Sequence, residues 1–97
     1  MADLEFTWDP AKAAANLAQH GVSFQEALTV FSDEAGLLLD DPGHSGTEDR
    51  FILLGLSARL RMLVVVHCYR QADTVIRLIS ARRADRLERE VYVQRNP

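Results

Sequence analysis

Arginine is concentrated near the C-terminus of this sequence. The stretch ISARRADRLERE, residues 79–90, holds four arginines in twelve residues. A guanidinium group is planar and binds a phosphate or a carboxylate through two parallel hydrogen bonds. The stretch therefore indicates a phosphate-binding face or, in the plainer interpretation, solvated cations that pair with acids on neighbouring elements.

These arginines belong to the cationic half of an acidic chain. The 97 residues carry a net charge of −3. Residues 1–50 hold ten acidic and two basic side chains, a net charge of −8, whereas residues 51–97 hold nine arginines and four acids, a net charge of +5. Lysine would serve solubility equally well, so the use of arginine favours recognition of an anion.

A histidine and a tyrosine add groups that can exchange protons. Residues 61–70, RMLVVVHCYR, read as a strand, and the alternation of a strand predicts His67 and Tyr69 on one face. Arg77 lies near that pair if the register of the next strand brings it there. A histidine titrates near neutral pH, which suits acid–base chemistry. The plainer interpretation of His67 is a buried or edge histidine hydrogen-bonded to the backbone.

A loop of oxygen-bearing side chains is a weaker candidate for chemistry. Residues 40–49, DDPGHSGTED, gather Asp40, Asp41, His44, Glu48 and Asp49, a composition that can hold a divalent cation. The spacing matches no calcium-binding loop, and the composition is also typical of an exposed turn. The sequence has no glycine-rich phosphate loop, paired-cysteine zinc spacing or nucleophile-elbow serine. We therefore expect no metal ion and no cofactor.

Composition predicts one soluble domain spanning residues 1–97, with 47% hydrophobic and 26% charged residues. The N-terminus has neither the basic start nor the apolar run of a signal peptide or membrane span, so we expect a cytoplasmic protein without membrane attachment. Cys68 is the single cysteine, which fits a reducing compartment and a place in the core.

The elements that must position these residues are well marked in the first third. Residues 4–8 alternate as a half-buried strand. Asp9 and Pro10 predict a helix over residues 11–20 that ends at Gly21, with His20 in its last turn complementing the helix dipole. Ser23 and Glu26 have the spacing of a capping box and predict a second helix over residues 24–32.

The rest of the chain reads as strands and a final helix. Residues 36–40, 50–57, 61–69 and 73–80 are β-rich, and the last three of these runs are close enough to form an antiparallel meander. Asp85 and Glu88 predict a capped helix over residues 86–94. The fold expected is α+β, an antiparallel sheet with two N-terminal helices and one C-terminal helix.

Several separated blocks resemble the BrnT family of type II toxin–antitoxin toxins. They are FTWDPAKAAANLAQHGVSFQEA, RFILLGLSARLRMLVVVHCYR and IRLISARRADRLEREVY, in the family's order and covering nearly the whole chain. Gln19 stands where the family commonly has lysine. The resemblance implies a RelE-like fold and a small ribonuclease. It also implies a BrnA-like antitoxin, which we expect in a toxin–antitoxin heterotetramer that binds operator DNA through the antitoxin.

Metal-free RNA cleavage uses the 2′-hydroxyl as nucleophile and needs a base, an acid and fixed cations for the phosphorane charge. With the resemblance, His67 is the acid–base candidate, Tyr69 would position or stack on a base, and Arg82 and Arg83 would converge on the phosphate. The candidate catalytic residues are His67, Tyr69, Arg82, Arg83 and Glu48, and the candidate substrate-binding residues are Arg50, Arg70, Arg77 and His20. Two alternatives stay open. One is an inactive module that binds nucleic acid or antitoxin, and the other is a metal-dependent nuclease built on the acidic loop.

Overall fold

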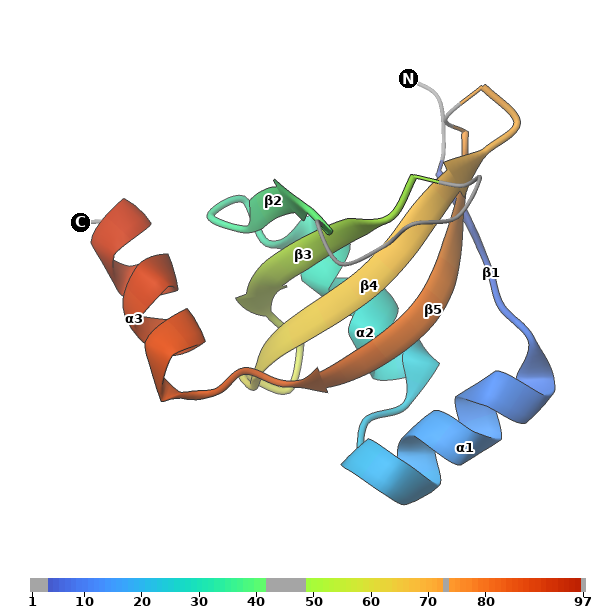
Figure 1. Cartoon of the computed structure of the whole chain (residues 1–97), viewed down its shortest axis with the longest axis horizontal. Coiled ribbons are helices and arrows are strands. Elements are labelled where there is room, and N and C mark those ends of the chain that lie inside the picture. Colours follow the sequence, from blue (N-terminus) through green and yellow to red (C-terminus); the bar gives the residue numbers. More distant parts are fainter. Residues whose placement is uncertain (1–3, 42–48, 73, 97) are drawn as a thin grey trace.

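In the part of the chain that the structure describes, five strands form one sheet, in the order β1-β5-β4-β3-β2, and three α-helices accompany it (Figure 1). The computed structural model describes residues 4–41, 49–72 and 74–96. The strands are β1 (Glu5–Thr7), β2 (Leu37–Asp40), β3 (Phe51–Leu56), β4 (Met62–Arg70) and β5 (Val75–Arg83). The helices are α1 (Pro10–His20), α2 (Phe24–Leu28), the short 3-10 helix η1 (Thr29–Ser32) and α3 (Arg86–Arg95). This arrangement confirms the predicted α+β fold class.

Strand pairing contains the predicted antiparallel meander of β3, β4 and β5 and adds one strand on each side of it. The pairs β2–β3, β3–β4 and β4–β5 are antiparallel. The first strand, β1, pairs in parallel with β5, with Phe6 opposite Ile76, so the complete sheet is mixed. Parallel neighbours need a long connection, and here the whole intervening chain supplies it. The sheet therefore ends in β1 on one side and β2 on the other.

Local signals account for the first helices. Asp9 caps α1 by accepting a hydrogen bond from Ala11 N at 2.8 Å, and Gly21 ends the helix in the left-handed region with φ of 68°. Only half of the capping box predicted for the second helix is formed. Ser23 Oγ accepts from Glu26 N at 3.0 Å, but the Glu26 carboxylate turns inward to other partners. The predicted helix continues as η1 after Leu28.

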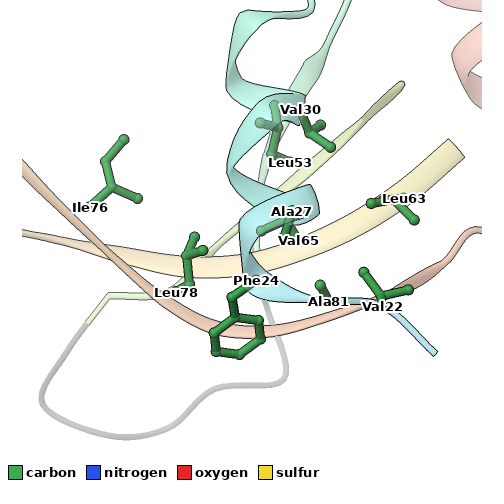
Figure 2. Packing of buried hydrophobic residues seen from close by; sticks show 10 residues of the cluster. All are labelled: Val22, Phe24, Ala27, Val30, Leu53, Leu63, Val65, Ile76, Leu78 and Ala81. Carbon is green, nitrogen blue, oxygen red and sulfur yellow. The ribbon is translucent and has the colours of Figure 1, made fainter. Parts of the chain in front are cut away.

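The main core lies between the sheet and the first two helices. In Figure 1, α2 lies behind the strands, and Figure 2 shows Phe24 and Ala27 of α2 packed against the sheet. The buried members of this cluster are Val22, Phe24, Ala27, Val30, Leu53, Leu63, Val65, Ile76, Leu78 and Ala81. The alternate residues of the same strands point to the other face. There a smaller cluster joins Leu54 and Val64 to Tyr92 of α3.

Three polar side chains, two of them buried, fix the helices to the sheet. Asn16 of α1 donates to Ala81 O at 2.8 Å and to Val22 O at 2.9 Å, and its carbonyl oxygen accepts from Ala81 N at 3.1 Å. Asp33, after η1, accepts from Leu56 N and from the Tyr92 hydroxyl, both at 2.8 Å. The Asn16 hydrogen bonds join α1 to β5, and the Asp33 hydrogen bonds join α3 to β3.

Glu26 is the third anchor and the one buried carboxylate among them. Its side chain is 4% exposed and accepts hydrogen bonds from Arg61 Nε at 2.8 Å, Arg61 Nη2 and Ser57 Oγ at 2.7 Å. The hydrogen bonds from Arg61 are the largest influence on Glu26 and hold the pKa of this carboxyl below its usual value, against the effect of burial. This network ties α2 to the β3–β4 turn.

The C-terminal helix begins as the sequence predicts. Asp85 Oδ1 accepts from Glu88 N, and the Glu88 carboxylate accepts from Asp85 N, both at 2.8 Å, which completes a capping box. None of the helices in the described parts of the chain is long and apolar enough to cross a membrane.

Candidate functional site

His67 is completely buried on the face of the sheet covered by α2 and η1. Its exposed fraction is 0%, and its ring lies edge-on to Phe31 with centroids 4.8 Å apart. Phe51 and Tyr69 are the next rings, at 6.2 and 5.2 Å. Burial lowers the pKa of His67, while its hydrogen bond to the backbone carbonyl of Val65 acts the other way. The imidazole is therefore neutral near pH 7.

The hydrogen bonds of His67 define its tautomer. Nδ1 lies 3.2 Å from Val65 O, and Nε2 lies 3.3 Å from the Tyr69 hydroxyl. A backbone carbonyl only accepts, so Nδ1 carries the proton of the neutral ring and Nε2 accepts from Tyr69. Tyr69 is partly exposed. Among the described residues, Tyr69 connects His67 to the surface, in agreement with the plainer interpretation of a backbone-bonded buried histidine.

The register of β4 and β5 separates His67 and Tyr69 from the nearby arginines. Arg77 pairs with Cys68, the residue between His67 and Tyr69. Directly paired residues share a face and neighbouring residues on a strand alternate, so Arg77 lies on the opposite face from the His67–Tyr69 pair. The expected grouping of Arg77 with that pair is therefore not formed.

The face opposite His67 gathers four of the candidate arginines, which we call the arginine face: Arg50, Arg70, Arg77 and Arg82. Arg70 is two residues beyond Cys68 on β4 and so shares its face. Arg50 immediately precedes Phe51, whose ring contacts Tyr69 with centroids 5.3 Å apart, so strand alternation directs Arg50 away from that ring. Arg82 pairs with Val64 of the smaller core cluster. Cys68, at 2% exposure, lies in the middle of this face.

Two members of the arginine face have unused hydrogen-bond donors. Among the residues that the structure describes, buried Arg50 Nε has no hydrogen-bond partner, and the Arg77 side chain makes no hydrogen bond or ion pair. A buried guanidinium nitrogen without an acceptor is costly, and an anion would satisfy it. The pair flanks Cys68 from the β3 and β5 sides. Their position is suited to holding one phosphate group.

Arg82 is differently placed, because α3 supplies it with a carboxylate. Its Nη1 and Nη2 donate to the two oxygens of Glu88, each at 2.8 Å, with the Arg82 side chain 44% exposed. The Arg82 hydrogen bonds are the largest influence on Glu88 and lower the pKa of its carboxyl. In this arrangement the Glu88 carboxylate offsets the positive charge of the Arg82 guanidinium.

Arg83 does not join Arg82, contrary to the expected convergence on one phosphate. The strand β5 extends to Arg83, three residues beyond the predicted end, and consecutive residues of a strand point to opposite faces. Arg83 pairs with Leu63 of the main core cluster. It lines a shallow cavity at the end of the sheet instead, together with Arg61 and Arg89, two arginines that the sequence did not single out.

The remaining candidates lie elsewhere or outside the described residues. His20 ends α1 beside Gly21, whose carbonyl oxygen accepts from Arg61 Nη2 at 3.1 Å, so it belongs to the end of the sheet and not to the arginine face. Glu48 and His44 lie outside the described residues. In the described segments, no group of three His, Cys, Asp or Glu side chains could hold a metal ion.

Comparisons with known proteins agree with this fold. A family model described as the ribonuclease toxin BrnT of type II toxin–antitoxin systems matches residues 8–88. The crystal structure of the Brucella abortus ribonuclease toxin BrnT is similar over 86% of this chain and 99% of that chain, with 21% identity and a TM-score of 0.62, which shows a shared fold. No curated protein matches the sequence. Because the family model spans most of the sequence, the chain belongs to the BrnT family of ribonuclease toxins of type II toxin–antitoxin systems.

Proposed function

We propose that this toxin is an endoribonuclease that binds RNA on the arginine face and cleaves it without a metal ion, which inhibits translation in the cytoplasm. The observation that carries the proposal is the pair Arg50 and Arg77. Both lie beside Cys68 on one face, and neither guanidinium has an acidic partner in the described chain. A phosphodiester would supply the missing acceptors.

The chemistry proposed is attack by the 2′-hydroxyl on the adjacent phosphorus. The new bond joins the 2′-oxygen to phosphorus, the bond to the 5′-oxygen breaks, and a 2′,3′-cyclic phosphate remains. Charge on the phosphorane oxygens grows in the transition state, and fixed guanidinium groups stabilise that charge without reorganising. Arg50 and Arg77 would take this role, with Arg70 and Arg82 holding neighbouring phosphates.

Proton transfer needs groups besides the arginines. Glu48, two residues before Arg50 in the sequence, stays our candidate base. The burial of His67 favours a supporting role, in which its Nε2 accepts the Tyr69 hydrogen bond and fixes the orientation of the phenol. Tyr69 is the partly exposed member of that pair, so Tyr69 and not His67 is our candidate for contact with RNA that extends beyond the arginine face to the opposite face of the sheet. His20, at the end of α1, would contact substrate only beyond the cleavage site.

The toxin family implies an antitoxin, and we propose a BrnA-like partner that covers the arginine face. Acidic side chains of the antitoxin would satisfy the same guanidinium groups and exclude RNA. Two toxins bound to an antitoxin dimer would give the heterotetramer expected from the sequence, with the antitoxin contacting operator DNA. Within this chain, Glu88 of α3 is an example of a carboxylate on this face, since it forms an ion pair with Arg82.

A binding module without catalysis is the second candidate. The separation of His67 and Tyr69 from the arginine face favours it, because the acid–base candidate His67 and the four arginines of that face lie on opposite faces of the sheet. Such a protein would hold RNA or an acidic antitoxin segment on the same arginines. It would differ from an enzyme only in lacking turnover.

Single-turnover cleavage and RNA affinity, measured on matched variants, distinguish the two functions. Arg77→Ala should slow cleavage by roughly a hundredfold, the usual cost of one transition-state donor. Arg95→Ala removes the same charge from the far end of α3 and should leave cleavage unchanged. Both variants should keep the native thermal midpoint. A native chain that binds RNA but gives no product above background would favour the binding module.

A further inference from the structure

A second group of arginines surrounds a cavity at the end of the sheet, next to the first turn of α3. The cavity has a volume of about 240 Å³ and is lined by Arg61, Met62, Arg83, Ala84 and Arg89. Three of these five residues are arginines, and none is acidic. A concave surface with this lining favours an anionic ligand.

The three arginines differ in how many donors they have free. Arg61 is held by Glu26, and Arg89 Nη1 donates to Ala84 O at 2.9 Å. The Arg83 side chain has no hydrogen bond or ion pair among the residues that the structure describes. Of the three cavity arginines, Glu26 forms an ion pair with Arg61 alone, so the cavity keeps a formal charge of about two positive units, mostly from Arg83 and Arg89.

The chemistry of the cavity favours a nucleotide over an acidic peptide. Met62 provides a partly buried thioether beside the guanidinium groups, and such a side chain makes favourable contacts with aromatic rings. Guanidinium planes also stack on bases. A phosphate with its attached base would use both kinds of group, whereas a carboxylate side chain would use only the arginines.

The position of the cavity relates it to the arginine face. Arg77 and Arg83 lie near opposite ends of β5, and a rise of about 3.3 Å per residue separates them by roughly 20 Å. Arg82 lies between them on the arginine face. Phosphates recur along an RNA strand, so one RNA chain that occupies Arg77 and passes Arg82 would extend toward the end of β5.

We propose that the Arg61–Arg83–Arg89 cavity is an RNA subsite, which binds a phosphate and its base several nucleotides away from the cleaved bond. The inference rests on the proposed function, since it assumes that RNA lies on the arginine face. It assigns Arg83 and Arg89 to substrate affinity and not to the chemical step. It also extends the substrate requirement to RNA long enough to reach both ends of β5.

The test measures affinity and turnover with separate probes. The binding probe is a 2′-O-methyl RNA oligonucleotide of roughly twelve nucleotides, which cannot be cleaved and is long enough for both regions. Arg83→Ala and Arg89→Ala should each weaken its binding about fivefold. The turnover probe is an unmodified dinucleotide, for which Arg89→Ala should keep the native kcat/KM. Arg95→Ala serves as the charge-matched control in both assays.

The outcomes are distinguishable from failure of the proposed function. Native cleavage of unmodified RNA tests the function, whereas binding of the 2′-O-methyl probe tests the subsite without turnover. Unchanged affinity in both Arg83→Ala and Arg89→Ala would overturn the subsite. So would weaker binding of antitoxin with unchanged binding of RNA, because the cavity would then be a protein-docking site. Arg83→Ala removes no hydrogen bond among described residues, so its result does not depend on refolding of α3.

Discussion

His67 lies where a charged imidazole would be costly. Its ring lies next to those of Phe31 and Phe51, and its polar contacts among the described residues are Val65 O and the Tyr69 hydroxyl. Protonating Nε2 would remove the acceptor of the Tyr69 hydrogen bond. At the scale of single residues, His67 therefore acts through Tyr69 and through packing, and its titration should be visible in protein stability.

The unfolding free energy should fall as pH drops below 6.5, the unperturbed value for histidine, because the unfolded chain then binds a proton that folded His67 does not. The sign follows from the lowered pKa of the folded state. Between about pH 7.5 and about pH 5.5 we expect this group to lower the stability of the native chain. Urea unfolding of the native chain and His67→Phe at both pH values measures the difference. Equal losses in the two proteins would show that His67 does not titrate abnormally.

Replacing Asn16 tests whether its buried amide holds α1 on the sheet. Asn16→Ala should lower the unfolding free energy by about 3 kcal/mol, because Ala81 N, Ala81 O and Val22 O lose their partner in a buried site. Gln19→Ala removes an exposed amide from the same helix and is the control. Urea unfolding of both variants checks the prediction. A change as small as that of the control would mean that water replaces the Asn16 contacts.

At the scale of elements, local sequence signals and strand pairing differ in how far they could be predicted. Asp9, Pro10 and Gly21 bound α1 through contacts within a few residues, and the same holds for the capping box of α3. These features were predicted correctly because their chemistry is local. Alternation along β4 likewise predicted that His67 and Tyr69 are neighbours on one face.

The pairing of one strand with another could not be predicted from residue patterns within single segments. The pairing of Arg77 with Cys68 depends on a β-bulge between β4 and β5, where Val66 pairs with Ser80 but His67 pairs with Leu78. The bulge inserts one residue into β5 and leaves no clear trace in composition. The candidate site was therefore identified by residue type, but its division between two faces was not.

Glu88, in the first turn of α3, forms an ion pair with Arg82 that offsets its positive charge. Glu88→Gln should keep the capping box, because a glutamine oxygen accepts from Asp85 N as well, while removing the charge that neutralises Arg82. RNA affinity should rise severalfold at low salt. Fluorescence anisotropy with labelled RNA measures the effect.

Glu90→Gln is the matched control for the α3 variant. It makes the same change on the same helix, but Glu90 pairs with Arg86 and not with Arg82. An equal rise in affinity for the two variants would point to net charge alone. Higher affinity only for Glu88→Gln would support a specific role of the Arg82–Glu88 ion pair.

At the scale of the whole molecule, charge is divided between the two halves of the sequence. Residues 51–97 form the strands β3, β4 and β5 and hold nine of the ten arginines. Four candidate arginines nevertheless share one face because β3, β4 and β5 are neighbours. An acidic protein thereby presents a cationic surface, which is what RNA binding requires.

The salt dependence of RNA binding measures how many phosphates the protein contacts. Binding of single-stranded RNA should weaken with salt, and Arg77→Ala should reduce the slope of log K against log salt by about 0.7, the contribution of one phosphate. Arg95→Ala should leave the slope at the native value. Titrations at several salt concentrations give both slopes. Equal slopes for the native chain and Arg77→Ala would place Arg77 away from the RNA.

Incubation of the purified toxin with RNA in the presence of excess EDTA tests the central claim most directly. Arginine-based stabilisation of the phosphorane predicts undiminished cleavage and products that end in a 2′,3′-cyclic phosphate or the derived 3′-phosphate. End-group analysis of the fragments identifies these products. Cleavage that stops with EDTA and returns with magnesium would contradict the account and favour a metal-dependent nuclease.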